Sequence, residues 1–214
     1  MQTTLLLIRH GESTWNREGR VQGWLDPPLS ERGVQQAALL AERLRAQPID
    51  ALYASPLQRA RATAQAIADL KGLPLSVDDW LREHRLGGIQ GLTADEIASK
   101  FPQLHARVGQ TELWASAPDE EPLEEFSERM RLCGAALAER HAGQTVAVVS
   151  HGGSINRLLM AWLGIDVRRH PVFHLDNTSI TQVRLRGALV QVMVLNDCSH
   201  LRELAAPGDL QTYW

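Results

Sequence analysis

The stretch Leu5-Leu6-Leu7-Ile8-Arg9-His10-Gly11-Glu12 (residues 5–12) decides the fold class of this 214-residue chain. Its first part, LLLIR at 5–9, is a short apolar run without polar alternation, which is typical of a strand buried on both faces. Such strands occur in parallel sheets that are covered by helices on both sides. The apolar run is too short for a membrane span or a signal peptide. We therefore expect a cytoplasmic protein with no membrane partner.

The rest of the chain alternates strand and helix patterns. DALYAS at 50–55 and TVAVVS at 145–150 predict two more buried strands, and ITQVRLR and LVQVMVL around Gly187-Ala188 predict a terminal hairpin. Helices are predicted at 31–46, 57–70, 123–141 and from Gly152 to Gly164. In the first of these, Ser30 is the expected N-cap and the expected buried face consists of Val34, Ala37, Ala38, Ala41 and Leu44. The alternation predicts an α/β fold, a three-layer sandwich with a mostly parallel central sheet flanked by helices.

Length and composition set limits on domain organisation and partners. The length fits one domain over residues 1–214, with an irregular, lid-like excursion around 101–122 that contains three prolines. Basic and acidic residues number 22 and 25 without a long run of either, which argues against a nucleic-acid partner. Cys133 and Cys198 show no ligand spacing and are expected to be free thiols.

The three predicted buried strands all end on chemically reactive residues. Arg9-His10-Gly11-Glu12 follows the first, Ser55-Pro56 with Arg59 and Arg61 follows the second, and Ser150-His151-Gly152-Gly153 follows the third. Because ligands of open α/β sheets bind beyond the carboxyl ends of the strands, these side chains are expected to converge. Arginine forks, glycine backbone N–H groups and helix N-termini together favour a phosphoryl group as the ligand.

The motifs then show a strong resemblance to a known family. RHGEST at 9–14, GRVQGWLDPPLSERG at 19–33, SPLQRARATA at 55–64, LREHRLGGIQGLT at 81–93, SHGG at 150–153 and NTSIT at 177–181 occur in the family's order. They resemble the histidine phosphatase superfamily, which is also called phosphoglycerate-mutase-like. The resemblance covers nearly the whole chain and implies the phosphoglycerate-mutase-like form of the three-layer fold.

The resemblance also implies the roles of individual residues. His10 would attack phosphorus and become phosphorylated, and Arg9, Arg59 and His151 would surround the phosphoryl oxygens. Glu83 would protonate the leaving oxygen and then activate water. Asn16, the Gly152 backbone N–H, Gln22 and Gly23 would bind the substrate. No metal and no cofactor are expected, and a homodimer is compatible with the family.

Phosphatase chemistry is favoured over two alternatives within the family. A 2,3-bisphosphoglycerate-dependent phosphoglycerate mutase fits Gln90, but the mutases are longer and must exclude water from their phosphohistidine. An inactive phosphate-binding or scaffold relative would usually have lost part of the catalytic set, which is complete here. We therefore predict a hydrolase of small phosphomonoesters. A metal-dependent hydrolase, from another class, lacks a paired Asp/His ligand motif.

Several further residues receive interpretations that the structure can test. Glu12 is expected to anchor the loop after His10 or a neighbouring histidine, and Arg61 to lie on the surface or behind the residues that contact the substrate. His84, His105, His141, His170, His174 and His200 show no ligand pattern. Many such phosphatases carry Gly-Gly-Glu-Ser where this chain reads Asp119-Glu120-Glu121-Pro122. Glu121 can be aligned with the Glu of that motif, and two extra carboxylates near the site mouth would disfavour highly anionic substrates.

Overall fold

The computed structural model describes residues 1–105, 117–166, 171–202 and residue 204. The central feature is a six-stranded sheet with the order β3-β2-β4-β1-β5-β6. Its strands are β1 (Thr3–Arg9), β2 (Ala51–Ala54), β3 (Leu75–Val77), β4 (Thr145–Ser150), β5 (Ile180–Arg186) and β6 (Leu189–Asp197). Strands β3, β2, β4 and β1 pair in parallel, whereas β5 is antiparallel to both β1 and β6. The predicted buried strands and the terminal hairpin are confirmed.

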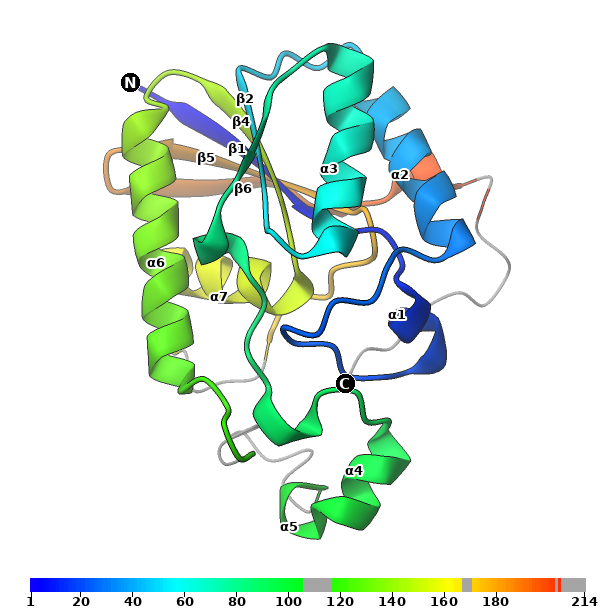
Figure 1. Cartoon of the computed structure of the whole chain (residues 1–214). Coiled ribbons are helices and arrows are strands. Elements are labelled where there is room, and N and C mark those ends of the chain that lie inside the picture. The colour runs from blue at the N-terminus through cyan, green and yellow to red at the C-terminus, as the bar shows by residue number, and fades with distance from the viewer. Residues whose placement is uncertain (106–116, 167–170, 203, 205–214) are drawn as a thin grey trace.

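Helices cover both faces of this sheet (Figure 1). α2 (Glu31–Arg43) and α3 (Gln58–Lys71) lie on one face, and α6 (Leu123–Arg140) and α7 (Gly152–Leu163) lie on the other. The shorter elements are α1 (Thr14–Glu18), α4 (Ala94–Lys100), α5 (Pro102–His105), η1 (Asp79–Leu81), η2 (Gly87–Ile89) and η3 (Ser199–Leu201). The predicted three-layer α/β architecture is therefore confirmed.

The uninterrupted apolar run of β1 follows from burial on both faces. Leu5 and Leu7 pack into the core beneath α6 and α7, whereas Leu6 and Ile8 pack into the core beneath α2 and α3. Strand β4 lies beside β1 in register, with Leu7 opposite Val148 and Arg9 opposite Ser150. Because side chains alternate along a strand, both sets must be apolar to fill two cores. The register also brings the reactive ends of β1 and β4 to the same edge.

The helix of residues 31–46 is shorter and turned differently from the prediction. α2 ends at Arg43, and the Ser30 hydroxyl caps it by accepting the Gly33 N–H at 3.0 Å. Its buried residues are Gly33, Gln36, Ala37, Leu40 and Ala41. Val34 is 58 % exposed and Ala38 is also exposed, so the predicted buried face was wrong at these two positions.

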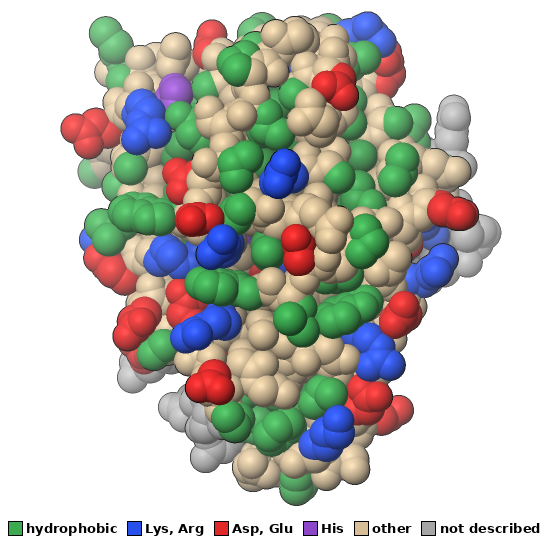
Figure 2. Space-filling model, in the orientation of Figure 1, with side chains coloured by type: hydrophobic (Ala, Val, Ile, Leu, Met, Phe, Trp, Pro, Cys, Tyr) green, Lys and Arg blue, Asp and Glu red, His purple; other side chains and the backbone are tan. Residues whose placement is uncertain are grey.

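Outside the main layers, α4 and α5 lie beyond the end of the sheet (Figure 1). A small core that includes Ile89, Ile97 and Ala117 packs beneath them. Residues 106–116 of the predicted excursion lie outside the described residues, so its role as a lid is not tested. On the face that Figure 2 shows, Lys and Arg side chains are interspersed with Asp and Glu. Among the described helices, none is long and apolar enough to span a bilayer.

Candidate active site

His10 lies immediately after β1, where the backbone is held from three sides. Its N–H donates to the Ser150 carbonyl at 2.9 Å, and its carbonyl accepts from the Asn177 side chain at 2.8 Å. The next N–H, of Gly11, donates to the Thr63 hydroxyl at 3.0 Å. Strand β4, helix α3 and the segment before β5 therefore fix the position of the His10 main chain.

The loop after His10 packs closely against the start of α2. A Cβ on Gly33 would lie 2.0 Å from the Glu12 carbonyl oxygen, so a larger residue would displace the loop. The Glu12 carboxylate accepts the Ser30 hydroxyl at 2.6 Å, and the Glu12 N–H donates to Gln36 at 2.8 Å. The prediction that Glu12 anchors this loop is confirmed.

The His10 ring is held as a neutral imidazole. Its Nδ1 lies 2.7 Å from the Gly11 carbonyl oxygen, which can only accept, so Nδ1 carries the proton. Burial, followed by the charges of Arg59 and Arg9, holds the pKa of His10 well below its usual value. The other ring nitrogen, Nε2, therefore keeps a lone pair at neutral pH and is available as a nucleophile.

His151 is the second imidazole of the site and begins α7 at the end of β4. It is buried, with its ring centroid 5.1 Å from that of His10, and its Nε2 lies 2.8 Å from the Ser55 hydroxyl. Burial, then Arg59, His10 and Arg9, lower the pKa of His151 well below its usual value. Its Nδ1 is buried and has no hydrogen-bond partner within the described residues. A buried polar atom of this kind fits a ligand oxygen.

Two buried arginines supply positive charge. Arg59 donates from Nη1 to Leu25 and from Nη2 to Gly23, both at 2.9 Å, and burial lowers its pKa to about 10, so it stays protonated at neutral pH. Its Nε has no hydrogen-bond partner in the part of the chain that is described. Arg9 donates to the Leu175 carbonyl and lies beside Gly152, where an added Cβ would be 3.6 Å from its Nε. Fixed guanidinium groups of this kind suit an anionic ligand.

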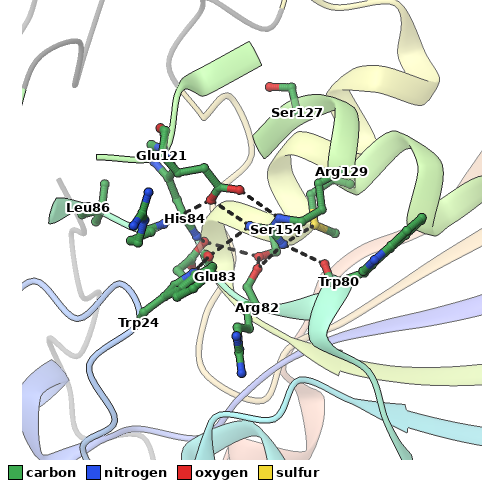
Figure 3. A network of polar contacts seen from close by, with 12 residues as sticks. Trp24, Trp80, Arg82, Glu83, His84, Leu86, Glu121, Ser127, Arg129 and Ser154 are labelled. Atoms are coloured by element: carbon green, nitrogen blue, oxygen red, sulfur yellow. Dashed lines mark hydrogen bonds and ion pairs between the residues drawn. The ribbon is translucent and has the colours of Figure 1, made fainter. Parts of the chain in front are cut away.

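Glu83 lies on an irregular segment between η1 and η2, and its carboxylate points toward the start of α7 (Figure 3). Oε2 accepts the Gly153 N–H at 3.0 Å, and Oε1 accepts the His84 N–H at 2.8 Å. A Cβ on Gly153 would lie only 2.4 Å from Oε1, so the approach depends on glycine. The Glu83 charge also acts on the pKa of Arg59, which links the carboxylate to the arginine and histidine cluster.

The four predicted substrate-binding residues lie around this cluster, and their contacts differ. Asn16 Oδ1 accepts the Ser13 N–H at 3.0 Å and closes a capping box on α1. Gln22 Oε1 lies 2.9 Å from the Ser13 hydroxyl, and Gly23 accepts from Arg59. Gly152 opens α7 beside Arg9. Asn16 and Gln22 thus contact the loop after His10, and their role toward substrate stays a prediction.

Two of the three acidic residues at positions 119–121 make contacts inside the protein. The Glu121 carboxylate pairs with Arg129 at 2.9 Å, and its side chain is 12 % exposed. Glu120 Oε1 lies 3.7 Å from His84 Nε2, with 9 % of its side chain exposed. Both of these carboxylates are turned inward, whereas Asp119 is exposed. The expected effect on highly anionic substrates therefore depends on Asp119 and stays a prediction.

The structure also describes the surroundings of several other residues that the sequence analysis named. Arg61 is exposed, as predicted. His84 is buried, donates from Nε2 to the Glu121 carbonyl at 2.7 Å and stacks on Phe126. Cys133 and Cys198 are free thiols. Within the described residues no three His, Cys, Asp or Glu side chains are grouped so as to hold a metal ion. The His105 side chain and His170 lie outside the described part of the chain.

Sequence reasoning gave no role to three residues that contact the site. Ser55 binds His151, Trp24 donates from Nε1 to the Glu83 carbonyl at 2.7 Å, and Arg129 donates to the same carbonyl at 3.2 Å. Ser55 was placed at the reactive end of the second buried strand, and Trp24 lies inside a stretch that carries the family resemblance. Arg129 lies in a helix of ordinary amphipathic character, and nothing in its local sequence marks it.

Comparisons with known proteins agree with this geometry. Residues 5–198 match the family described as histidine phosphatase superfamily (branch 1). The chain is 36 % identical over 205 residues to phosphoserine phosphatase 1 of Hydrogenobacter thermophilus, covering 93 % of this chain and 94 % of that protein. It is 34 % identical over 177 residues to the probable phosphoglycerate mutase GpmB of Yersinia pestis, covering 83 % and 82 %. The structure of a mycobacterial glucosyl-3-phosphoglycerate phosphatase superposes with a TM-score of 0.81 at 32 % identity, covering 92 % and 99 %.

Buried imidazoles and guanidinium groups that meet at the carboxyl edge of a mostly parallel sheet define an enzyme of phosphoryl transfer. This chain belongs to the histidine phosphatase superfamily, branch 1. Its relatives include phosphatases named as such, and the protein is accordingly a phosphatase of this family.

Proposed function

We propose that the protein hydrolyses small phosphomonoesters through a phosphohistidine at His10. The observation that carries this is the proton on Nδ1, held by the Gly11 carbonyl at 2.7 Å, which leaves Nε2 unprotonated among buried cations. Phosphoserine is the first substrate to test, because a 36 % identical relative is a phosphoserine phosphatase.

In the first step His10 Nε2 attacks phosphorus and the bond to the ester oxygen breaks. Glu83 acts as the general acid in this proposal and gives a proton to the departing oxygen, so the product alcohol leaves neutral. Arg9, Arg59 and His151 hold the equatorial oxygens while charge develops on them. Asn16, Gln22, Gly23 and the Gly152 N–H complete the phosphate surroundings in this proposal.

In the second step a water molecule attacks the phosphohistidine. The Glu83 carboxylate accepts the water proton, the phosphorus–nitrogen bond breaks, and inorganic phosphate is released. His10 returns to its neutral form. Neither step requires a metal ion, so the proposal includes activity in the presence of EDTA.

The test combines a substrate screen with a trapping experiment. Phosphate release from a panel of metabolites is measured with EDTA present, for the wild type, His10→Ala and His141→Ala. His141 is the matched control, because it contacts Tyr53 and Thr3 at the opposite end of the sheet. We expect His10→Ala to lose at least about a thousandfold in kcat while His141→Ala keeps its activity. Rapid quenching should trap an acid-labile phosphate label on the wild type and on His141→Ala only.

A mutase remains the alternative to test, since GpmB of Yersinia pestis is among the relatives. Gln90, which fits the mutase pattern, has a structural role here: its Oε1 accepts the Trp24 N–H at 2.7 Å and the Leu86 N–H at 3.3 Å. It anchors the loop beside Gly23 whatever the reaction, so it does not favour a mutase. Efficient conversion of 3- to 2-phosphoglycerate with little hydrolysis would contradict the proposal.

We also propose that residues 1–214 form one catalytic domain.

We further propose that the protein is cytoplasmic and forms a homodimer through strand β6. β6 is the last strand of the sheet, and its apolar side chains are exposed at Leu189, Val192, Met193, Val194 and Leu195. An edge that has no strand partner among the described residues and that carries apolar side chains favours pairing with a second copy. Light scattering should give a dimer for the wild type and a monomer for Val192→Lys/Val194→Lys. A monomeric wild type would overturn this assembly.

A further inference from the structure

Arg129 connects α6 to the segment that carries Glu83. Its side chain is 16 % exposed, and all five guanidinium N–H groups have acceptors (Figure 3). Nη1 donates to the carbonyls of Trp80 at 2.8 Å and Arg82 at 2.9 Å. Nη2 donates to the Glu83 carbonyl at 3.2 Å. Nε and Nη2 also bind the two oxygens of Glu121, at 3.0 and 2.9 Å.

The segment that Arg129 binds has little regular structure of its own. Residues 82–86 lie between η1 and η2, outside the helices and strands of the sheet, and Leu86 forms an isolated antiparallel bridge with Glu120. The Glu83 carbonyl is bound by Arg129 and by Trp24 Nε1 at 2.7 Å. The Glu83 carboxylate, in contrast, is bound by the N–H groups of Gly153 and His84. The Glu83 carbonyl is thus held by α6 and Trp24, and the Glu83 carboxylate by α7 and by the next residue of its own segment.

Glu121 orients the guanidinium by a paired contact. The two parallel N–H···O bonds leave the remaining three N–H groups directed at the segment of residues 80–83. The same carboxylate accepts the Arg85 N–H at 3.3 Å, and the Glu121 N–H donates to the Arg85 carbonyl at 2.8 Å. Arg129 and Glu121 therefore form one clamp on both sides of Glu83.

We propose that Arg129, oriented by Glu121, is a positioning residue that places the Glu83 carboxyl for proton transfer to the leaving group. This inference rests on the proposed role of Glu83. A displacement of about 1 Å at a reacting group lowers a rate by as much as about a hundredfold, so the clamp matters although it touches no substrate. A lysine has three donors without the planar fork, so it does not replace Arg129.

The test uses the dependence of the rate on the leaving group. Phosphoserine releases a basic alkoxide that needs a proton, whereas 4-nitrophenyl phosphate releases a stable phenolate that does not. The measured quantity is kcat/KM, which reports the first irreversible step, in which the ester bond breaks. We expect Arg129→Met and Arg129→Lys to lower kcat/KM for phosphoserine at least about tenfold more than for 4-nitrophenyl phosphate. Glu121→Gln should show the same selectivity more weakly.

Arg131→Met is the matched control. Arg131 lies on the same helix and pairs with Glu128 at 2.6 Å, but 51 % of its side chain is exposed and it does not contact the segment of residues 80–83. This variant should leave both rates unchanged. Melting temperatures of all variants separate misfolding from misplacement, and Glu121→Gln decides the question if Arg129→Met does not fold.

Glu83→Gln provides the reference that separates the two proposals. If Glu83→Gln affects phosphoserine selectively and the Arg129 and Glu121 variants slow both esters equally or not at all, the positioning role is wrong while the function stands. If Glu83→Gln itself slows both esters equally, the acid role of Glu83 fails, and the inference about Arg129 fails with it. If variants of Glu83, Arg129 and Glu121 all lower kcat/KM selectively for phosphoserine, both the acid role of Glu83 and the positioning role of Arg129 are supported.

Discussion

The ring of His10 lies edge-on to the ring of His151, with centroids 5.1 Å apart and planes inclined by 60°. Two imidazolium cations at this distance, beside Arg9 and Arg59, would repel one another strongly in a buried site. The low pKa values of both histidines follow from burial first and from these charges second. The resting site therefore holds two neutral imidazoles next to two fixed cations.

This arrangement predicts how the two rings titrate. Because the pKa of each is lowered well below 6.5, neither ring should gain a proton between pH 8 and 6.5. Ring ¹⁵N and ¹³C NMR shifts, assigned with His10→Ala and His151→Ala, measure this directly. An inflection at or above pH 6.5 for either ring would contradict the prediction.

The same shift makes stability depend on pH. Below pH 6.5 the unfolded chain protonates His10 while the folded protein resists protonation, so the free energy of unfolding decreases as pH falls toward the folded pKa. His10→Asn removes this contribution. As pH falls from 7 to 5, the wild type should therefore lose stability that His10→Asn does not lose. The free energy of unfolding of His10→Asn minus that of the wild type should increase over this range in urea titrations. A difference that stays constant with pH would show that His10 does not contribute.

Ser55 should act through His151. The Ser55 hydroxyl lies 2.8 Å from His151 Nε2, and its oxygen also accepts the Leu57 N–H at 3.4 Å, so this hydroxyl influences which nitrogen of His151 carries the ring proton. Ser55→Ala should lower kcat about tenfold, the loss expected from one hydrogen bond of about 1.4 kcal/mol, and should change the tautomer seen by ¹⁵N NMR. Ser150→Ala is the control: it removes a buried hydroxyl that binds the Leu81 carbonyl at 2.8 Å, and the His151 tautomer should not change.

Substitution of Gly153 by alanine should lower activity without lowering stability. Ala is favoured over Gly within a helix by about 1 kcal/mol, and Gly153 lies in the first turn of α7. The added Cβ would meet the flexible end of Glu83, at 2.4 Å from Oε1, and displace the carboxylate. Gly153→Ala should therefore keep or raise the melting temperature and lower kcat/KM for phosphoserine about tenfold or more. In a Glu83→Ala background the same change should have no further effect on activity.

Substrate charge can be tested at Trp24. The guanidinium carbons of Arg82 and Arg85 lie 4.9 and 5.6 Å from the centre of the Trp24 ring, and Trp24 follows the Gly23 carbonyl that binds Arg59. We expect these cations to favour substrates with an additional anionic group. Arg85→Ala should raise KM for phosphoserine about threefold to fivefold, as for a partly exposed charge pair, and leave KM for 4-nitrophenyl phosphate unchanged. Equal changes for both esters would contradict this.

The sequence by itself determined five of the six strands, the layers and the location of the reactive edge, whereas the short strand β3 (Leu75–Val77) was not predicted. Uninterrupted apolar runs such as Leu5–Ile8 can only be satisfied by two cores, and residues that directly follow parallel strands must meet at one edge. The order of residues along the chain is therefore enough to place His10, Arg59 and His151 together. These features follow from the hydrophobic pattern of short segments, so a residue and its neighbours in the chain are enough to predict them.

Only the tertiary structure decided the contacts that depend on packing between distant segments. The face of α2 is turned by the close approach of Gly33 to Glu12 and by the bond from the Glu12 N–H to Gln36, which leaves Val34 exposed despite its apolar character. Glu121 turns inward because Arg129 offers it a paired contact. Arg129 reaches the Glu83 carbonyl across 46 positions in the chain, a distance over which hydrophobic periodicity carries no signal.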